Sequence, residues 1–250
     1  MRLVTRYFVS LSLLLFCWWL VVVVFDIPSY ICPPPSKVFI EIKSNFDLYF
    51  SATLWTSKNF ILGFFFGVFF GVFWAVLLHS SKVLKYVLEP LLTVFQSFPR
   101  ESLFPLFVMW FGFGSQSKVF GAFLLCFFAT TMLMLGALDK QKTEFSEIIN
   151  TLELGRLAAL FHVQIPASIP DLMTILKLVF PLSMIGAVVT EFMGGQGGLG
   201  HIIISSSSNF SAEPVYASIC CMAAVGIFFF GMLSLAERPV NTRFLGLEVK

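Results

Sequence analysis

The sequence predicts an all-α integral membrane protein of about six transmembrane helices, and three observations support this fold class. Of the 250 residues, 58% are apolar and 12% are charged, which is about half the charged fraction of an average soluble domain. The mean hydropathy is +0.89. Uncharged stretches long enough for a helix to cross the hydrocarbon core recur along the chain. The net charge of +2 comes without a basic cluster, so nucleic-acid binding is not expected.

Six stretches are predicted to form the membrane helices: residues 7–25, 59–78, 90–110, 119–138, 172–190 and 215–236. The third stretch contains Pro90, Pro99 and Pro105, and because proline removes a helical hydrogen bond, this stretch is predicted to be bent or broken.

Three polar stretches are predicted to lie outside the bilayer core. Residues 26–58 contain three consecutive prolines and scattered charges, which indicates a loop with a short amphipathic helix after Ser36. Residues 191–214 are rich in Gly and Ser and are predicted to form another loop. Residues 139–171 are the longest strongly polar stretch, so we expect them to lie outside lipid.

The second predicted helix carries Gly63, Gly67 and Gly71. Small residues at every fourth position form a smooth stripe on one face of a helix, which lets a neighbouring helix approach closely in lipid. We therefore predict a close helix–helix contact along this face.

The positions of lysine and arginine predict the orientation, because cytoplasmic flanks of membrane helices are enriched in these residues. With the amino terminus inside, ten cations lie on inner flanks and four on outer flanks. The inner ones are Arg2, Arg6, Lys82, Lys85, Lys140, Lys142, Arg156, Arg238, Arg243 and Lys250, and the outer ones are Lys37, Lys43, Lys58 and Lys118. Both termini and the stretch 139–171 are therefore predicted to be cytoplasmic.

The cysteines and histidines indicate no metal site. Four of the five cysteines lie inside apolar runs, where we interpret them as small hydrophobic side chains. Cys32 follows a basic and then apolar start, but the bulky Ile31 before it argues against a lipid-modified leader, so the first helix is expected to remain as an anchor. His79, His162 and His201 are too scattered for metal binding, and no chemistry is predicted for them.

The polar stretch contains a recognisable motif. From Glu147 to Pro170 the sequence is EIINTLELGRLAALFHVQIPASIP. From about Ser146 its apolar and charged residues have helical spacing, and Pro166 is predicted to stop or redirect the helix. The segment resembles the coupling loop of binding-protein-dependent ABC importer permeases: Glu-Ala-Ala, three residues, Gly, and later an aliphatic residue, Leu and Pro. From Glu147 to Pro166 the spacing of this pattern is kept without a gap.

The segment departs from that pattern at four positions. Ile148 and Ile149 replace the alanines, Glu153 stands at the glycine, and Ile165 replaces the leucine, while Gly155 comes two places late. Because the glycine permits a tight turn between two short helices, Glu153 is expected to require a different backbone geometry or another turn position.

The resemblance extends over roughly residues 56–236 and points to the branch of the family that serves nitrate, sulfonates, taurine and related small molecules. It rests on an ordered set of weak motifs: Gly63-Phe64, Gly67, Gly71, Pro90, Pro99, Pro105-Leu106, Trp110-Phe111-Gly112, Gly114, Pro166, Pro170, Lys177, Glu191 and Gly198-Leu199-Gly200.

The resemblance implies a single permease domain over residues 1–250 of the type I importer kind, with a cytoplasmic coupling loop at 139–171, in the bacterial inner (cytoplasmic) membrane. It implies a homodimeric or heterodimeric permease, with a second permease copy in the homodimer. It also implies two ATP-binding cassette ATPase subunits and an extracytoplasmic solute-binding protein. The chain lacks the phosphate-cradling G-x-x-x-x-G-K-[ST] loop, so ATP and Mg²⁺ are expected on the ATPase and no cofactor or catalytic residue on this subunit. The expected ATPase contacts are Glu147, Leu152, Glu153, Gly155, Leu157, Leu160, Phe161 and Pro166.

Two cations interrupt predicted membrane helices, where a bare charge is costly. Arg100 is expected either to line the pathway and attract an anionic solute, or to pair with Glu101 or lie at the interface. Lys177 is expected either to line the pathway or to extend toward the cytoplasmic surface. Glu191 is expected to mark the outer end of the fifth helix.

Other functions remain open. The segment after Ser146 could be an amphipathic helix lying on the membrane surface. A channel or secondary carrier working alone would need no ATPase. An intramembrane protease would need a serine with a histidine, or paired carboxylates, inside the helices, and neither is visible in the sequence. The solute is expected to be small, and these patterns leave open whether it is nitrate-like, sulfonate-like, taurine-like or a pyrimidine precursor.

Overall fold

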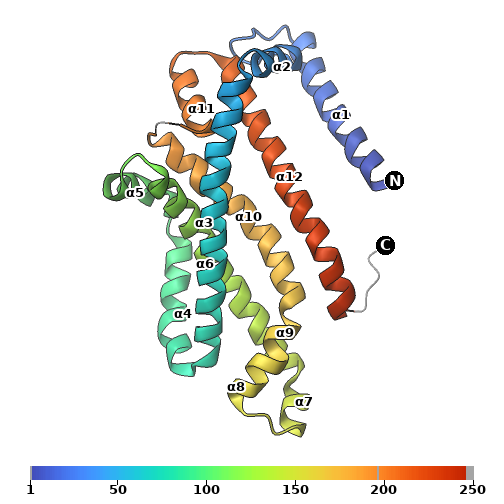
Figure 1. The fold of residues 1–250 in the computed structure, drawn as a ribbon, viewed down its shortest axis with the longest axis vertical. Helices are drawn as coiled ribbons and strands as arrows, with labels where there is room; N and C mark the ends of the chain where they lie inside the picture. The colour runs from blue at the N-terminus through green and yellow to red at the C-terminus, as the bar shows by residue number, and fades with distance from the viewer. Residues whose placement is uncertain (1, 196, 246–250) are drawn as a thin grey trace. The chain divides into compact units, whose positions relative to one another are not determined.

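The computed structural model describes residues 2–195 and 197–245, and all its regular elements in these ranges are helical, which confirms the all-α prediction (Figure 1). The long helices are α1 (Arg2–Val24), α3 (Phe46–Ser80), α6 (Ser115–Glu144), α10 (Ile169–Phe192) and α12 (Ala212–Leu245). The shorter ones are α2 (Pro35–Ser44), α4 (Lys82–Ser97), the 3-10 helix η1 (Arg100–Leu103), α5 (Phe104–Phe111), α7 (Ser146–Thr151), α8 (Arg156–Ala159), the π-helix η2 (Leu160–Gln164), α9 (Ile165–Ala167) and α11 (Leu199–Ser208).

Within the described residues, four helices are long and apolar enough to cross a membrane: α3, α6, α10 and residues Ala212–Glu237 of α12. Residues Ser12–Val24 of α1 form a shorter apolar helix. The predicted third stretch is divided among α4, η1 and α5, which confirms that it is broken near its prolines. Lys250 lies outside the described residues, and the described side chains do not include those of Arg2, Arg6, Arg238 and Arg243.

The chain divides into two compact units. The first comprises Met1–Thr56 and Gly195–Val225, and the second comprises Ser57–Gly194 and Gly226–Lys250. The single domain over residues 1–250 stays a prediction.

The first unit is held together by a cluster of buried side chains from α2, α3, α11 and α12: Val38, Tyr49, Ala52, Leu199, Ile202 and Ala217. Two loop predictions are wrong here, since residues 46–58 belong to α3 and residues 199–208 form α11. Both stretches are amphipathic. In the first, Asp47 is exposed while Tyr49 and Ala52 are buried. In the second, the Ser205 hydroxyl donates to backbone carbonyls of its own helix.

In the second unit, α3 and α6 approach each other along the glycine stripe, as predicted. A Cβ added at Gly63 would lie 2.3 Å from the Cβ of Ala122, and one at Gly67 would lie 2.6 Å from the Cβ of Cys126. A side chain at Gly71 would meet Thr130 in the same way. The glycines are therefore required by the closeness of α6, and they bring the two helices into backbone contact.

The α6–α10 contact is equally close. A Cβ added at Gly186 would lie 2.5 Å from the carbonyl oxygen of Gly121, and one at Gly121 would lie 2.2 Å from Oγ1 of Thr190. Helix α6 is thus packed between α3 and α10, and it continues beyond residue 138 to Glu144.

Candidate coupling site

The predicted coupling segment folds as a compact helical handle, which we define as residues 146–167. It contains α7, a turn over residues 152–155, and then α8, η2 and α9 in succession. The handle lies beyond the end of α6 and leads directly into α10 (Figure 1). It is therefore joined covalently to two of the closely packed helices of the second unit.

The turn is made at Glu153. The amide of Glu153 donates to the carbonyl of Asn150 (3.1 Å) and the amide of Leu154 donates to the carbonyl of Ile149 (3.0 Å), which is the hydrogen-bond pattern of a Schellman motif. In this motif the residue after the cap takes the left-handed conformation, and Glu153 has a φ of +47°. The expectation that Glu153 needs another geometry or turn position is wrong: the glutamate takes the conformation that glycine adopts most easily.

Gly155 and Pro166 differ from their predicted roles. Gly155 has φ −59° and ψ 154°, an extended conformation open to other residues, so this late glycine does not make the turn. The helical backbone continues through Pro166 after the π-turn η2, and the chain is interrupted only at Ser168, before α10 begins. The wider π-turn accommodates the proline without ending the helix.

The outer surface of the handle carries exposed apolar side chains. Leu152, Leu157 and Phe161 are between 58% and 64% exposed, and Ile148 is exposed as well. They form two pairs at a spacing of four residues, one on α7 and its end and one across α8 and η2, so each pair shares a helix face.

Charged residues stand next to Ile148, Leu152 and Leu157 in the sequence. Glu147, Glu153 and Arg156 of the predicted segment are all exposed. Exposed apolar groups among charges are typical of a surface that binds another protein. Leu160, predicted at the same contact, is only 2% exposed and packs inside the chain, while Pro166 is partly buried.

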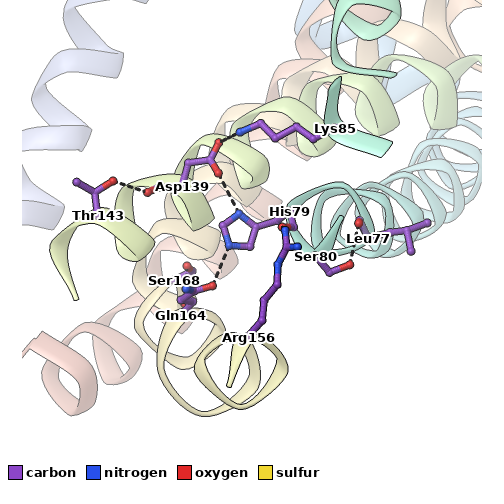
Figure 2. A network of polar contacts seen from close by, with 9 residues as sticks. All are labelled: Leu77, His79, Ser80, Lys85, Asp139, Thr143, Arg156, Gln164 and Ser168. Atoms are coloured by element: carbon purple, nitrogen blue, oxygen red, sulfur yellow. Dashed lines mark hydrogen bonds and ion pairs between the residues drawn. The ribbon is translucent and has the colours of Figure 1, made fainter. Parts of the chain in front are cut away.

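Beneath the handle lies a polar network that joins it to the ends of α3 and α6 (Figure 2). Nδ1 of His79 on α3 lies 2.9 Å from Oδ1 of Asp139 on α6, and Nε2 lies 2.8 Å from Oε1 of Gln164 in η2. Lys85 on α4 donates to the other oxygen of Asp139. Nη2 of Arg156 donates to the backbone carbonyl of His79 over 3.3 Å.

The sequence does not predict this network, and its patterns indicate no chemistry for His79. The signal available in the sequence is weak: His79 ends an uncharged run, and Gln164 is a single polar residue in an otherwise mostly apolar stretch. Their pairing could not be read from spacing, because His79 lies 60 and 85 positions from its two partners.

The two candidate pathway cations have different surroundings. Lys177 on α10 forms an ion pair with Glu237 on α12, with 2.5 Å between Nζ and Oε2, so its charge is compensated within the chain. Arg100 lies in η1, and its Nη1 is buried without a hydrogen-bond partner among the groups that the structure describes.

The membrane-length apolar helices and the charged handle at the end of α6 define a multi-pass membrane protein. The family model of the binding-protein-dependent transport system inner membrane component matches residues 67–241. The chain belongs to this family. It is thus an ABC transporter permease subunit of the inner membrane and not itself an enzyme, as the resemblance implied.

Three relatives illustrate the range of the family. The riboflavin transport system permease protein RibX of Chloroflexus aurantiacus is 31% identical and covers 92% of this chain and 87% of its own length. The formylaminopyrimidine transport permease protein ThiX of Halalkalibacterium halodurans is 26% identical over 83% of this chain and 84% of its own. The taurine transport system permease protein TauC of Escherichia coli is 25% identical over 97% and 89%.

Proposed function

We propose that this chain forms the translocation pathway of an importer of the type I kind, and that a partner ATPase binds its handle. In this proposal about six helices span the membrane, both termini and the handle are cytoplasmic, and a second copy completes the pathway. ATP and Mg²⁺ act on the ATPase, and an extracytoplasmic receptor delivers the solute. The observation that carries the proposal is the set of exposed apolar pairs on the charged handle.

The handle suits this role because of how it is attached. An apolar helix face docks in a groove of a partner protein, and its burial provides the binding energy. Movement of the partner on ATP binding would then be passed to α6 and α10, which enter and leave the handle. Leu152, Leu157 and Phe161 are the proposed docking side chains, supported at the turn by Glu153 and from inside by Leu160.

The proposal is tested by co-expressing the chain with its ATPase and purifying the complex. Substituting Leu157→Asp together with Phe161→Asp should abolish co-purification of the ATPase, because it places two charges in an apolar contact. Phe210→Ser, a change at an exposed phenylalanine in the first unit, serves as the control and should retain the ATPase. ATP-independent uptake by the chain alone would instead favour a stand-alone carrier.

We further propose that the solute is small and anionic, and that Arg100 attracts it. The support is the buried, unpartnered Nη1 of Arg100, in contrast to the compensated charge of Lys177. The relatives named for taurine, riboflavin and formylaminopyrimidine transport leave the solute class open, so it must be measured.

Uptake of labelled taurine, nitrate and riboflavin should be compared in Arg100→Gln and Arg100→Lys. Loss of anion uptake in the first, with partial activity in the second and full assembly with the ATPase in both, is the expected result. Unchanged uptake in Arg100→Gln would remove this residue from the pathway.

A further inference from the structure

We propose that His79 is a positioning residue that locks the handle to the ends of α3 and α6, so that movement of the handle moves these helices together. This inference rests on the proposed function, because it names the residue through which the handle transmits the action of the ATPase. Neither the spacing of the sequence motif nor the family match assigns a role to this histidine.

The position of His79 between two elements supports this role. The residue is 8% exposed, at the last turn of α3, and its two ring nitrogens lie within hydrogen-bond distance of Asp139 on α6 and Gln164 on the handle. Its backbone carbonyl accepts from Arg156, a second residue of the handle. One residue thus connects the handle to both closely packed helices.

The contact between the handle and the helix ends leaves space around this link. A cavity of about 160 Å³ lies between the handle and the helix ends, and it is lined by His79, Lys142 and Arg156 together with residues of α7 and α8. The polar contacts of His79 therefore lie at the wall of a cavity, beside the buried Leu160. Figure 2 shows Arg156 and Gln164 reaching from the handle to the same histidine.

The polar partners act as one unit because they are shared. Asp139 contacts both His79 and Lys85, and Gln164 is itself 5% exposed and approaches the histidine ring over 2.8 Å. His79 and Gln164 are both buried, and buried polar groups are costly to leave unpaired, so the contact between them is expected to be kept when the helices move. A contact shared by the handle, α3 and α6 is a physical link through which movement of one element can reach the others.

The test measures movement of α3 rather than transport of a solute. In a variant whose five native cysteines are replaced by alanine, Leu62→Cys places a thiol on the exposed side of α3, far along the helix from His79. The rate of maleimide labelling is measured in the complex with its ATPase, with and without ATP and vanadate. In the otherwise unchanged chain, trapping the ATPase should change this rate.

His79→Ala and Gln164→Leu should each reduce the ATP-dependent change about tenfold while the ATPase still binds and hydrolyses ATP, within the range known for coupling between sites. The double variant should be no worse than either single one, because both remove the same link. His201→Ala, at a histidine in the first unit, is the matched control and should behave as the unchanged chain.

The outcomes separate the two proposals. If the unchanged complex shows no ATP-dependent labelling, the proposed function fails and this inference fails with it. If the unchanged complex shows it and His79→Ala shows it equally, only the role of His79 is overturned. The shared link would also be overturned if the double variant reduced the ATP-dependent change in labelling by the combined effect of His79→Ala and Gln164→Leu.

Discussion

At the scale of single residues, Glu153 shows how a departure from a motif can keep the geometry of the motif. The Schellman hydrogen bonds place this residue in the left-handed region, with φ +47°, although it carries a side chain. The conformation costs free energy in any residue with a Cβ. The turn is thus fixed by its hydrogen bonds and neighbours rather than by the residue type.

Glu153→Gly should therefore stabilise the protein by about 1 kcal/mol, because it removes the strain of a left-handed glutamate. Gly155→Ala is the matched change: its extended backbone and open surroundings predict no loss of stability. Thermal unfolding in detergent of both variants measures the effect. A destabilised Glu153→Gly would show that the glutamate side chain contributes more than its conformation costs.

Lys118 is a second residue whose role the structure changes. Counted in the sequence as an outer-flank cation, it is buried, and its ammonium donates to the backbone carbonyls of Phe113 and Gly194, each over 2.8 Å. It also interacts electrostatically with the buried Glu191. The lysine thereby ties the start of α6 to the loop after α10.

Lys118→Met should destabilise the protein by about 2 kcal/mol, because it leaves the carbonyls of Phe113 and Gly194 without their buried donor. The measurement is the fraction of folded, monodisperse protein after heating, compared with Lys58→Met at an exposed lysine. Equal behaviour of the two variants would show that the buried contacts contribute little.

At the scale of elements, the contacts between α3, α6 and α10 depend on small residues. The predicted stripe of Gly63, Gly67 and Gly71 was confirmed by the closeness of α6, whereas Gly121 and Gly186 were not recognised as a contact. The sequence of a single membrane helix does not show which of its glycines are needed for a close contact with another helix.

Gly67→Leu should separate α3 from α6, because even a Cβ at this position would lie 2.6 Å from that of Cys126. A loss of about 3 kcal/mol or complete misassembly is expected from such overpacking. Gly136→Leu on α6 is the matched control, since a Cβ there meets no neighbour within 4 Å. Expression and size-exclusion profiles compare the two, and a normal profile for Gly67→Leu would contradict the close contact.

At the scale of the whole molecule, the orientation remains a prediction from the distribution of lysine and arginine. In the cysteine-free variant, Thr151→Cys on the handle should react with a membrane-impermeant maleimide only after the membrane is opened. Phe210→Cys, in the stretch predicted to be outside, should react in intact cells. Labelling of Thr151→Cys from outside would overturn both the orientation and the role of the handle.

Much of the fold was predictable because its causes are local. Four predicted apolar stretches correspond to membrane-length helices, and the broken third stretch follows from its prolines. The predictions for residues 46–58 and 199–208 are wrong for one reason. Polar residues are typical of loops, but each of these stretches is a helix that buries one face and exposes the other.

The candidate site was predicted in part. The location of the handle and the exposure of Leu152, Leu157 and Phe161 agree with the expected segment, but the buried position of Leu160 depends on which face of η2 turns inward. The π-turn shifts this face, and a sequence read with a regular helical period gives no sign of it.

The sequence by itself determined the membrane class, the position of the handle in the chain and the family. Hydropathy is a sum over consecutive residues, and a motif is an order of residues, so both are contained in the sequence. The tertiary structure decided that His79 meets Asp139 and Gln164, that Lys118 is buried, and that Glu153 makes the turn. These depend on groups brought together across the fold, and their energies arise from pairing and desolvation, which a linear pattern does not contain.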